Sequence, residues 1–150
     1  MSFEPHDKKY EDVLVDDVFT FNHTFSREDI DVFSKITGDR NLLHLDRDFA
    51  LRKGFKSEAV FGMLSASLFS RLIGMYCPGK NALYLSQSID FKKPLFVNSE
   101  ITVKGTVLKK FDKFKMIKMK TEIIDDTNIY ITGEASARFI IDVWELQNSP

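Results

Sequence analysis

The longest apolar stretch of the chain spans residues 63–76 and reads Met63-Leu64-Ser65-Ala66-Ser67-Leu68-Phe69-Ser70-Arg71-Leu72-Ile73-Gly74-Met75-Tyr76. Wound as a helix, it is apolar around most of its girth, which is typical of a helix buried on nearly all sides. It is too short, and too interrupted by serines, Arg71 and Gly74, to supply the ~20 apolar residues of a membrane span. Pro78-Gly79 ends it. We therefore expect a buried central helix.

Strand patterns surround this helix. Before it, phenylalanines alternate with polar residues over 18–25, and after it come four long segments with period-two patterns, at 83–91, 100–110, 114–124 and 129–140. The short turns between them favour antiparallel pairing. The sequence thus predicts an α+β fold in which an antiparallel sheet wraps around the long helix. Such a sheet has edges to cover, and dimerisation through an edge strand is one solution.

A shorter helical region is predicted between the first strand and the central helix. Ser26 and Asp29 have the spacing of a capping box, and Gly38 suits the position just after a helix. Asp46 is placed to cap a second short helix that ends at Gly54. The buried face of the first helix is expected to carry Ile30, Phe33 and Ile36 or Thr37.

Composition narrows the class of protein. The 150 residues predict one globular domain, 1–150, because 43% are apolar and 14 are Phe. The net charge of -1 and the mixed signs make nucleic acid an unlikely partner. The basic run at 109–120 alternates with apolar residues, as on the solvated face of strands.

The start of the chain and its cysteine indicate a compartment. Residues 1–12 read as a loose lead-in without the apolar core of a signal peptide, so we expect a cytoplasmic protein that is not membrane-bound. Cys77 is the sole cysteine, which excludes an internal disulfide and fits a reducing compartment. We expect it to be a small packed residue rather than a nucleophile.

The strongest candidates for chemistry are Asp39 and His44, five positions apart directly after the Gly38 helix end. A carboxylate and an imidazole can hold one water and move its protons, as adding or removing water across a double bond requires. Asn41 lies between them and can shape the loop. The alternative is structural, with Asp39 capping a turn and His44 filling a polar niche.

A second candidate is Gly62, at the expected N-terminus of the central helix. Free N–H groups there favour negative charge and suit an oxygen that gains charge in a transition state. Gly62 is equally suited to tight packing or a cap. The sequence gives little indication of a metal site, because the three histidines have no ligand-like spacing. It also contains no nucleophile elbow and no nucleotide-binding loop.

The segment Gly38-Asp39-x-Asn41-x-Leu43-His44 resembles the hydratase signature Gly-Asp-x-Asn-Pro-(aliphatic)-His of the MaoC-like, (R)-specific enoyl-CoA hydratase family, of the short single-domain bacterial type. Five further stretches match members of that family in order, at residues 61–70, 78–79, 84–88, 91–97 and 132–135. The resemblance runs from about residue 18 to 140, and it implies a hot-dog fold.

The resemblance also implies roles for individual residues. Asp39 and His44 would activate the water, the Gly62 amide would polarise the thioester carbonyl, and Asn41 would orient the loop. Ser70 and Ile73 would help to line the acyl pocket. The family needs no metal or redox cofactor, since CoA is only the substrate's carrier, and its members are homodimers with active sites at the subunit interface.

Two departures from the family pattern stand out. Leu42 replaces the usual proline, so the loop loses a fixed φ angle. Phe61 replaces the histidine that usually precedes Gly-Met. That histidine is not the family's proton-transfer residue, so the chemistry should survive while pocket polarity or CoA contacts differ.

The leading hypothesis is therefore reversible (R)-specific hydration of trans-2-enoyl-CoA to (R)-3-hydroxyacyl-CoA. The sequence leaves open which of Asp39 and His44 is base and which is acid. One alternative is a 3-hydroxyacyl-ACP dehydratase, for which Lys53, Lys56, Lys92 and Lys93 are candidate carrier contacts. The other is a non-catalytic protein that binds acyl thioesters. Acyl chain length and pathway are not determined by the sequence.

Overall fold

The structure is a computed structural model in which residues 4–142 are described. The helical elements are η1 (Tyr10–Asp12), α1 (Arg27–Thr37), α2 (Leu42–Leu45), α3 (Arg47–Arg52), α4 (Gly62–Arg71), the π-helical η2 (Leu72–Tyr76) and η3 (Asp112–Phe114). The strands are β1 (Val18–Thr24), β2 (Ala82–Gln87), β3 (Asp90–Phe91), β4 (Glu100–Phe111), β5 (Met116–Ile124) and β6 (Ile129–Phe139).

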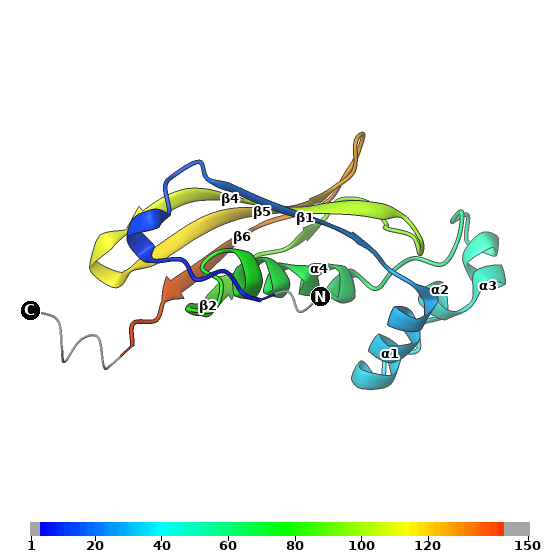
Figure 1. Cartoon of the computed structure of the whole chain (residues 1–150). Helices are drawn as coiled ribbons and strands as arrows, with labels where there is room; N and C mark the ends of the chain where they lie inside the picture. The colour runs from blue at the N-terminus through cyan, green and yellow to red at the C-terminus, as the bar shows by residue number, and fades with distance from the viewer. Residues whose placement is uncertain (1–3, 143–150) are drawn as a thin grey trace, which may run out of the picture.

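The strands form one antiparallel six-stranded sheet in the order β1-β4-β5-β6-β2, with the short β3 paired to β6. The sheet arches over α4, and α1 to α3 project beyond one of its ends (Figure 1). The predicted α+β architecture, a sheet wrapped around one long helix, is confirmed. The expected strand 83–91 is divided into β2 and β3, with a register shift between Tyr84 and Ser86.

Helix α4 is buried on one face only, so the expectation of burial on nearly all sides is wrong for the single chain. Leu68 and Phe69 belong to the core, whereas Met63 is 59% exposed and Ser70 lies on the exposed side. The physical reason is that a single sheet covers one side of a helix. After Arg71 the helix continues as one π turn, in which the Cys77 N–H donates to the Leu72 carbonyl over 3.1 Å.

Close packing of sheet and helix depends on Gly105 in β4. A Cβ at this position would lie 2.7 Å from Leu72 Cδ2 and 2.8 Å from Met119 Cε. Both of these neighbours are fully buried. The missing side chain therefore lets η2 sit directly against the middle of the sheet.

Helix α1 begins and ends where the sequence predicted. Ser26 and Asp29 form the capping box of α1, and Gly38 ends that helix with φ 76°. Ile30 is fully buried, but Ile36 is 76% exposed and Thr37 is exposed as well, so the expectation that one of these two lies on the buried face is wrong. The N-terminal end of α4 faces the end of the molecule that carries α1 to α3 (Figure 1).

The described part of the lead-in, residues 4–12, is not loose. Tyr10 is 5% exposed and its hydroxyl donates to Asp112 over 2.8 Å, while the His6 N–H donates to the Met75 carbonyl over 2.9 Å. The expectation of a loose segment was wrong because the segment, although mostly polar, is anchored by the buried ring of Tyr10. Residues 1–3 lie outside the described part.

The face of the sheet turned away from α4 is charged, as expected for a solvated face. Lys118 pairs with Glu134 across β5 and β6, and Lys120 pairs with Glu122 along β5. Among residues 4–142, no helix has both the length and the apolar character needed to cross a bilayer.

Candidate active site

His44 lies on the four-residue helix α2, where its ring is partly buried. Its Nδ1 atom is 2.7 Å from the backbone carbonyl oxygen of Ala59. A carbonyl oxygen only accepts hydrogen bonds, so in the neutral imidazole Nδ1 carries the hydrogen and Nε2 keeps the lone pair. The arrangement thus leaves Nε2 as the ring nitrogen that can accept a proton.

A cavity of about 270 Å³ joins His44 to the start of α4. Gly62 is the first residue of α4 and lines this cavity together with His44. The first hydrogen bond of the helix runs from the Ser65 N–H to the Phe61 carbonyl over 3.0 Å. The preceding amides, that of Gly62 among them, stand at the positive end of the helix dipole. An imidazole and amide donors therefore border the same cavity.

The rest of the cavity is largely apolar, with two lysines. Its other lining residues are Leu43, Ala59, Val60, Ser65, Phe91, Lys92, Lys93, Pro94, Leu95 and Ile131. An apolar cavity with a few polar groups converging on it is the usual form of a site for a small organic molecule. It suits an uncharged acyl chain better than a sugar or a nucleotide.

Asp39 lies on the exposed loop between α1 and α2, outside the lining of this cavity. Its Oδ1 accepts the Asn41 N–H over 2.9 Å, and its backbone carbonyl accepts the Ser34 hydroxyl over 2.6 Å. Asn41 in turn caps α2, where its Oδ1 accepts the Leu43 N–H over 3.0 Å. These bonds order the loop although Leu42 stands where the family pattern has proline.

Ser70 and Ile73, which the resemblance implies for the acyl pocket, do not line this cavity. Ser70 lies on the exposed side of α4, and Ile73 is 1% exposed in the part of the core that Tyr10 and Cys77 share. Their contribution to an acyl pocket stays a prediction.

Sequence reasoning missed three residues of the site. Ala59 orients His44 through its backbone carbonyl, and Phe91 and Ser65 help to line the cavity. A backbone carbonyl leaves no signature in the sequence, because any residue can supply one. Lys92 and Lys93 were considered only as carrier contacts, and both line the cavity.

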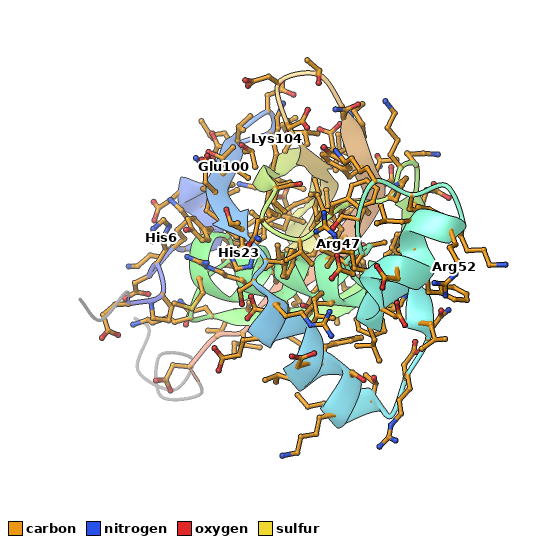
Figure 2. The ribbon with its side chains drawn as sticks, turned by 90° about the vertical axis from the view of Figure 1, so that its right-hand side faces the viewer. His6, His23, Arg47, Arg52, Glu100 and Lys104 are labelled. Carbon is orange, nitrogen blue, oxygen red and sulfur yellow. The ribbon has the colours of Figure 1, made fainter. Side chains whose placement is uncertain are left out.

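The other titratable candidates lie elsewhere. Neither His6 nor His23 lines the cavity, and Figure 2 shows His6 on the left of the view and Arg52 of α3 on the right. Burial raises the pKa of the Cys77 thiol to about 12, as expected for a packed residue rather than a nucleophile. Within residues 4–142, no group of three or more His, Cys, Asp or Glu side chains is arranged to hold a metal ion.

These features define a class: a helix wrapped by an antiparallel sheet, with a partly buried imidazole and the N-terminus of the helix beside one apolar cavity. Residues 12–129 match the model of the MaoC like domain family, and the chain belongs to that family. The resemblance expected from the Asp39–His44 segment is confirmed.

Individual relatives agree with this assignment. The chain is 38% identical over 112 residues to an (R)-specific enoyl-CoA hydratase of Aeromonas caviae, covering 74% of this chain and 84% of that protein. It is 35% identical over 140 residues to a mitochondrial 3-hydroxyacyl-[acyl-carrier-protein] dehydratase of Arabidopsis thaliana, covering 91% and 82%. The solved (R)-hydratase of A. caviae, described as involved in PHA biosynthesis, superposes with a TM-score of 0.83 at 34% identity, covering 86% of this chain and 98% of that one. The hot-dog fold is confirmed.

Proposed function

We propose that this protein catalyses the reversible (R)-specific hydration of trans-2-enoyl-CoA to (R)-3-hydroxyacyl-CoA. The observation that carries the proposal is that His44 and Gly62 border one apolar cavity. The (R)-specific enoyl-CoA hydratases among its relatives supply the substrate class and the stereochemistry.

Hydration needs a base for the water and a stabilised thioester oxygen. The hydroxyl adds to Cβ, a proton adds to Cα, and negative charge develops on the carbonyl oxygen between these two events. The Gly62 amide, at the N-terminus of α4, is the donor for that oxygen. Nε2 of His44 takes a proton from the water, since Nδ1 is engaged by Ala59.

Asp39 is the second residue that binds the water in this proposal. Its loop is fixed to the end of α1 by the bond from Ser34 and leads directly into α2, which carries His44. The ionised carboxylate would accept a hydrogen bond from the water and so hold it, and the proton that His44 takes from the water is returned to Cα, so that one hydroxyl and one proton are added in all. No metal or redox step is part of the proposal, because CoA serves as the carrier alone.

The test is a spectrophotometric assay of crotonyl-CoA hydration, followed by chiral analysis of the product. We expect loss of the enoyl absorbance and formation of the (R)-3-hydroxy product. Formation of the (S) product, or acyl-CoA binding by calorimetry without turnover, would reject the proposal, and the latter outcome would identify a non-catalytic thioester-binding protein.

A second candidate function keeps the reaction and replaces CoA with acyl carrier protein. Lys92 and Lys93 line the cavity that His44 borders, and the side chain of Lys92 is 51% exposed. An acidic carrier would be attracted to such lysines, and the attraction would weaken with salt. Matched crotonyl-CoA and crotonyl-ACP substrates decide between the carriers, and a higher kcat/KM for the ACP substrate that Lys92→Ala reduces would favour the dehydratase.

We further propose that the protein is a cytoplasmic homodimer with its active sites at the subunit interface. Strand β2 is a sheet edge whose Leu83 and Leu85 are 46% and 49% exposed, and Met63 on α4 is 59% exposed. Unpaired strand edges and exposed apolar side chains are features that a second copy covers. Analytical ultracentrifugation should give twice the chain mass, cell fractionation tests the location, and a monomer that retains full activity would contradict the shared sites.

A further inference from the structure

One face of the His44 imidazole is covered by the ring of Phe61. The two ring centroids lie 4.0 Å apart, and the ring planes are inclined by 32°. Phe61 is 3% exposed and is not among the residues that line the cavity. Phe61 therefore supports the imidazole without bordering the space in which substrate would lie.

Phe61 is itself held at two points. Its ring packs against Phe33 of α1, with centroids 5.1 Å apart. Its carbonyl oxygen accepts the N–H of Ser65 over 3.0 Å and the hydroxyl of Ser65 over 3.2 Å, where α4 begins. The ring thus connects His44 with α1 and with the helix start that presents Gly62.

A single hydrogen bond does not fix an imidazole ring. The bond from Nδ1 to Ala59 fixes the position of one ring atom, and the tilt of the ring plane still depends on the broad χ2 torsion of the side chain. An aromatic face at 4.0 Å restricts that rotation, because aromatic pairs have preferred geometries and the core around Phe61 is close-packed. Together the two contacts define where Nε2 points.

We propose that Phe61 is a positioning residue that holds the His44 imidazole in its reactive orientation. The inference rests on the proposed function, since it assigns the orientation of the proposed acid–base group. It also gives a role to Phe61, one of the two positions at which this chain departs from its family pattern. Proton transfer is sensitive to small displacements, so losing the aromatic face should slow the chemical step more than it weakens substrate binding.

Phe61→Leu tests this role, with Phe33→Leu as the matched control. Leucine is apolar and smaller than phenylalanine and has no flat face, so each change removes one ring from the same aromatic stack. Phe33 packs against Phe61, and Phe33→Leu leaves in place both the Phe61 ring over the imidazole and the Ser65 hydrogen bonds that hold the Phe61 backbone. Phe61→Leu should lower kcat for crotonyl-CoA about tenfold with KM changed less than about twofold. Phe33→Leu should leave kcat within about twofold of wild type, even where it lowers the melting temperature as much as Phe61→Leu does.

A spectroscopic readout separates this inference from the proposed function. The ring current of Phe61 should shift the His44 ring-proton resonances in wild type and in Phe33→Leu, and Phe61→Leu should abolish the shift. A wild type that turns over no enoyl thioester would reject the proposed function, and the resonances would still show whether the Phe61 ring lies on the imidazole. The inference is overturned if the His44 resonances are the same in all three proteins. It is equally overturned if kcat falls in both variants in proportion to their loss of stability.

Discussion

The ring of Phe91 packs directly over Gly62. A Cβ at Gly62 would lie 2.9 Å from Phe91 Cε1 and 3.0 Å from Cζ. Both residues line the cavity that His44 borders, and Phe91 is 54% exposed. Glycine at the start of α4 therefore allows an aromatic ring close to the amide that the proposed function uses.

Gly62→Ala should therefore lower kcat/KM about ten- to a hundredfold, because the methyl group displaces Phe91 into the cavity and crowds the thioester oxygen. Gly74→Ala is the matched control, since a Cβ there meets nothing within 4 Å. The double variant Gly62→Ala/Phe91→Leu should recover part of the activity. Steady-state kinetics on crotonyl-CoA give the answer, and wild-type kcat/KM in Gly62→Ala would refute the crowding.

The cap of α2 leads to a second prediction. Asn41→Ala removes the oxygen that accepts the Leu43 N–H over 3.0 Å, and should cost about 1 kcal/mol of unfolding free energy. Because the cap also shapes the loop that carries Asp39, kcat should fall about three- to tenfold. Asn41→Asp keeps the acceptor and should stay near wild type in both urea unfolding and kinetics. Equal losses in the two variants would mean that the amide group does something other than cap.

The contact of Gly105 with the helix predicts a stability effect away from the site. Gly105→Ala places a methyl group between Leu72 and Met119, both 0% exposed, and should lower the free energy of unfolding by about 1–3 kcal/mol. The side-chain ends must shift in a close-packed interior. Urea denaturation measures the loss, and Gly74→Ala again serves as the control. Unchanged stability would show that η2 does not need this close approach.

Cys77 provides a test at alkaline pH. Its pKa is raised from 9.0 to about 12 by burial, so its contribution to stability is complete below pH 9 and is lost as the pH rises toward 12. At pH 8 the folded protein should react with a thiol reagent far more slowly than the protein in urea. Labelling of the native protein at the rate of a free thiol would contradict this burial.

Local chemical signals made part of the fold predictable. The capping box of Ser26 and Asp29, the Gly38 helix end and the Asp46 cap depend on residues a few positions apart, and all three are present. Ile36 and the outer face of α4 were predicted wrongly because periodicity identifies an apolar face without saying what covers it. Tyr10 was missed for a related reason, since its partner Asp112 lies 102 residues away.

The site was predictable to the extent that its chemistry is carried by side chains. His44 and Gly62 were recognised separately and border one cavity. The contacts that orient His44 come from the Ala59 backbone and from the packing of Phe61, and neither is visible without the fold. Asp39 lies on the loop where the sequence predicted it, but it is not among the residues that line the cavity. Its contribution to the chemistry is therefore tested by a variant of its own.

In the proposed mechanism Asp39 and His44 together activate the water. The most direct measurement is kcat for crotonyl-CoA hydration by Asp39→Asn and His44→Ala, with Asp48→Asn on the exposed side of α3 as the control. Each of the first two variants should lose at least about a hundredfold in kcat while circular dichroism and melting temperature stay close to wild type, and the control should keep its activity. Full activity in either Asp39→Asn or His44→Ala would rule out activation of the water by this pair.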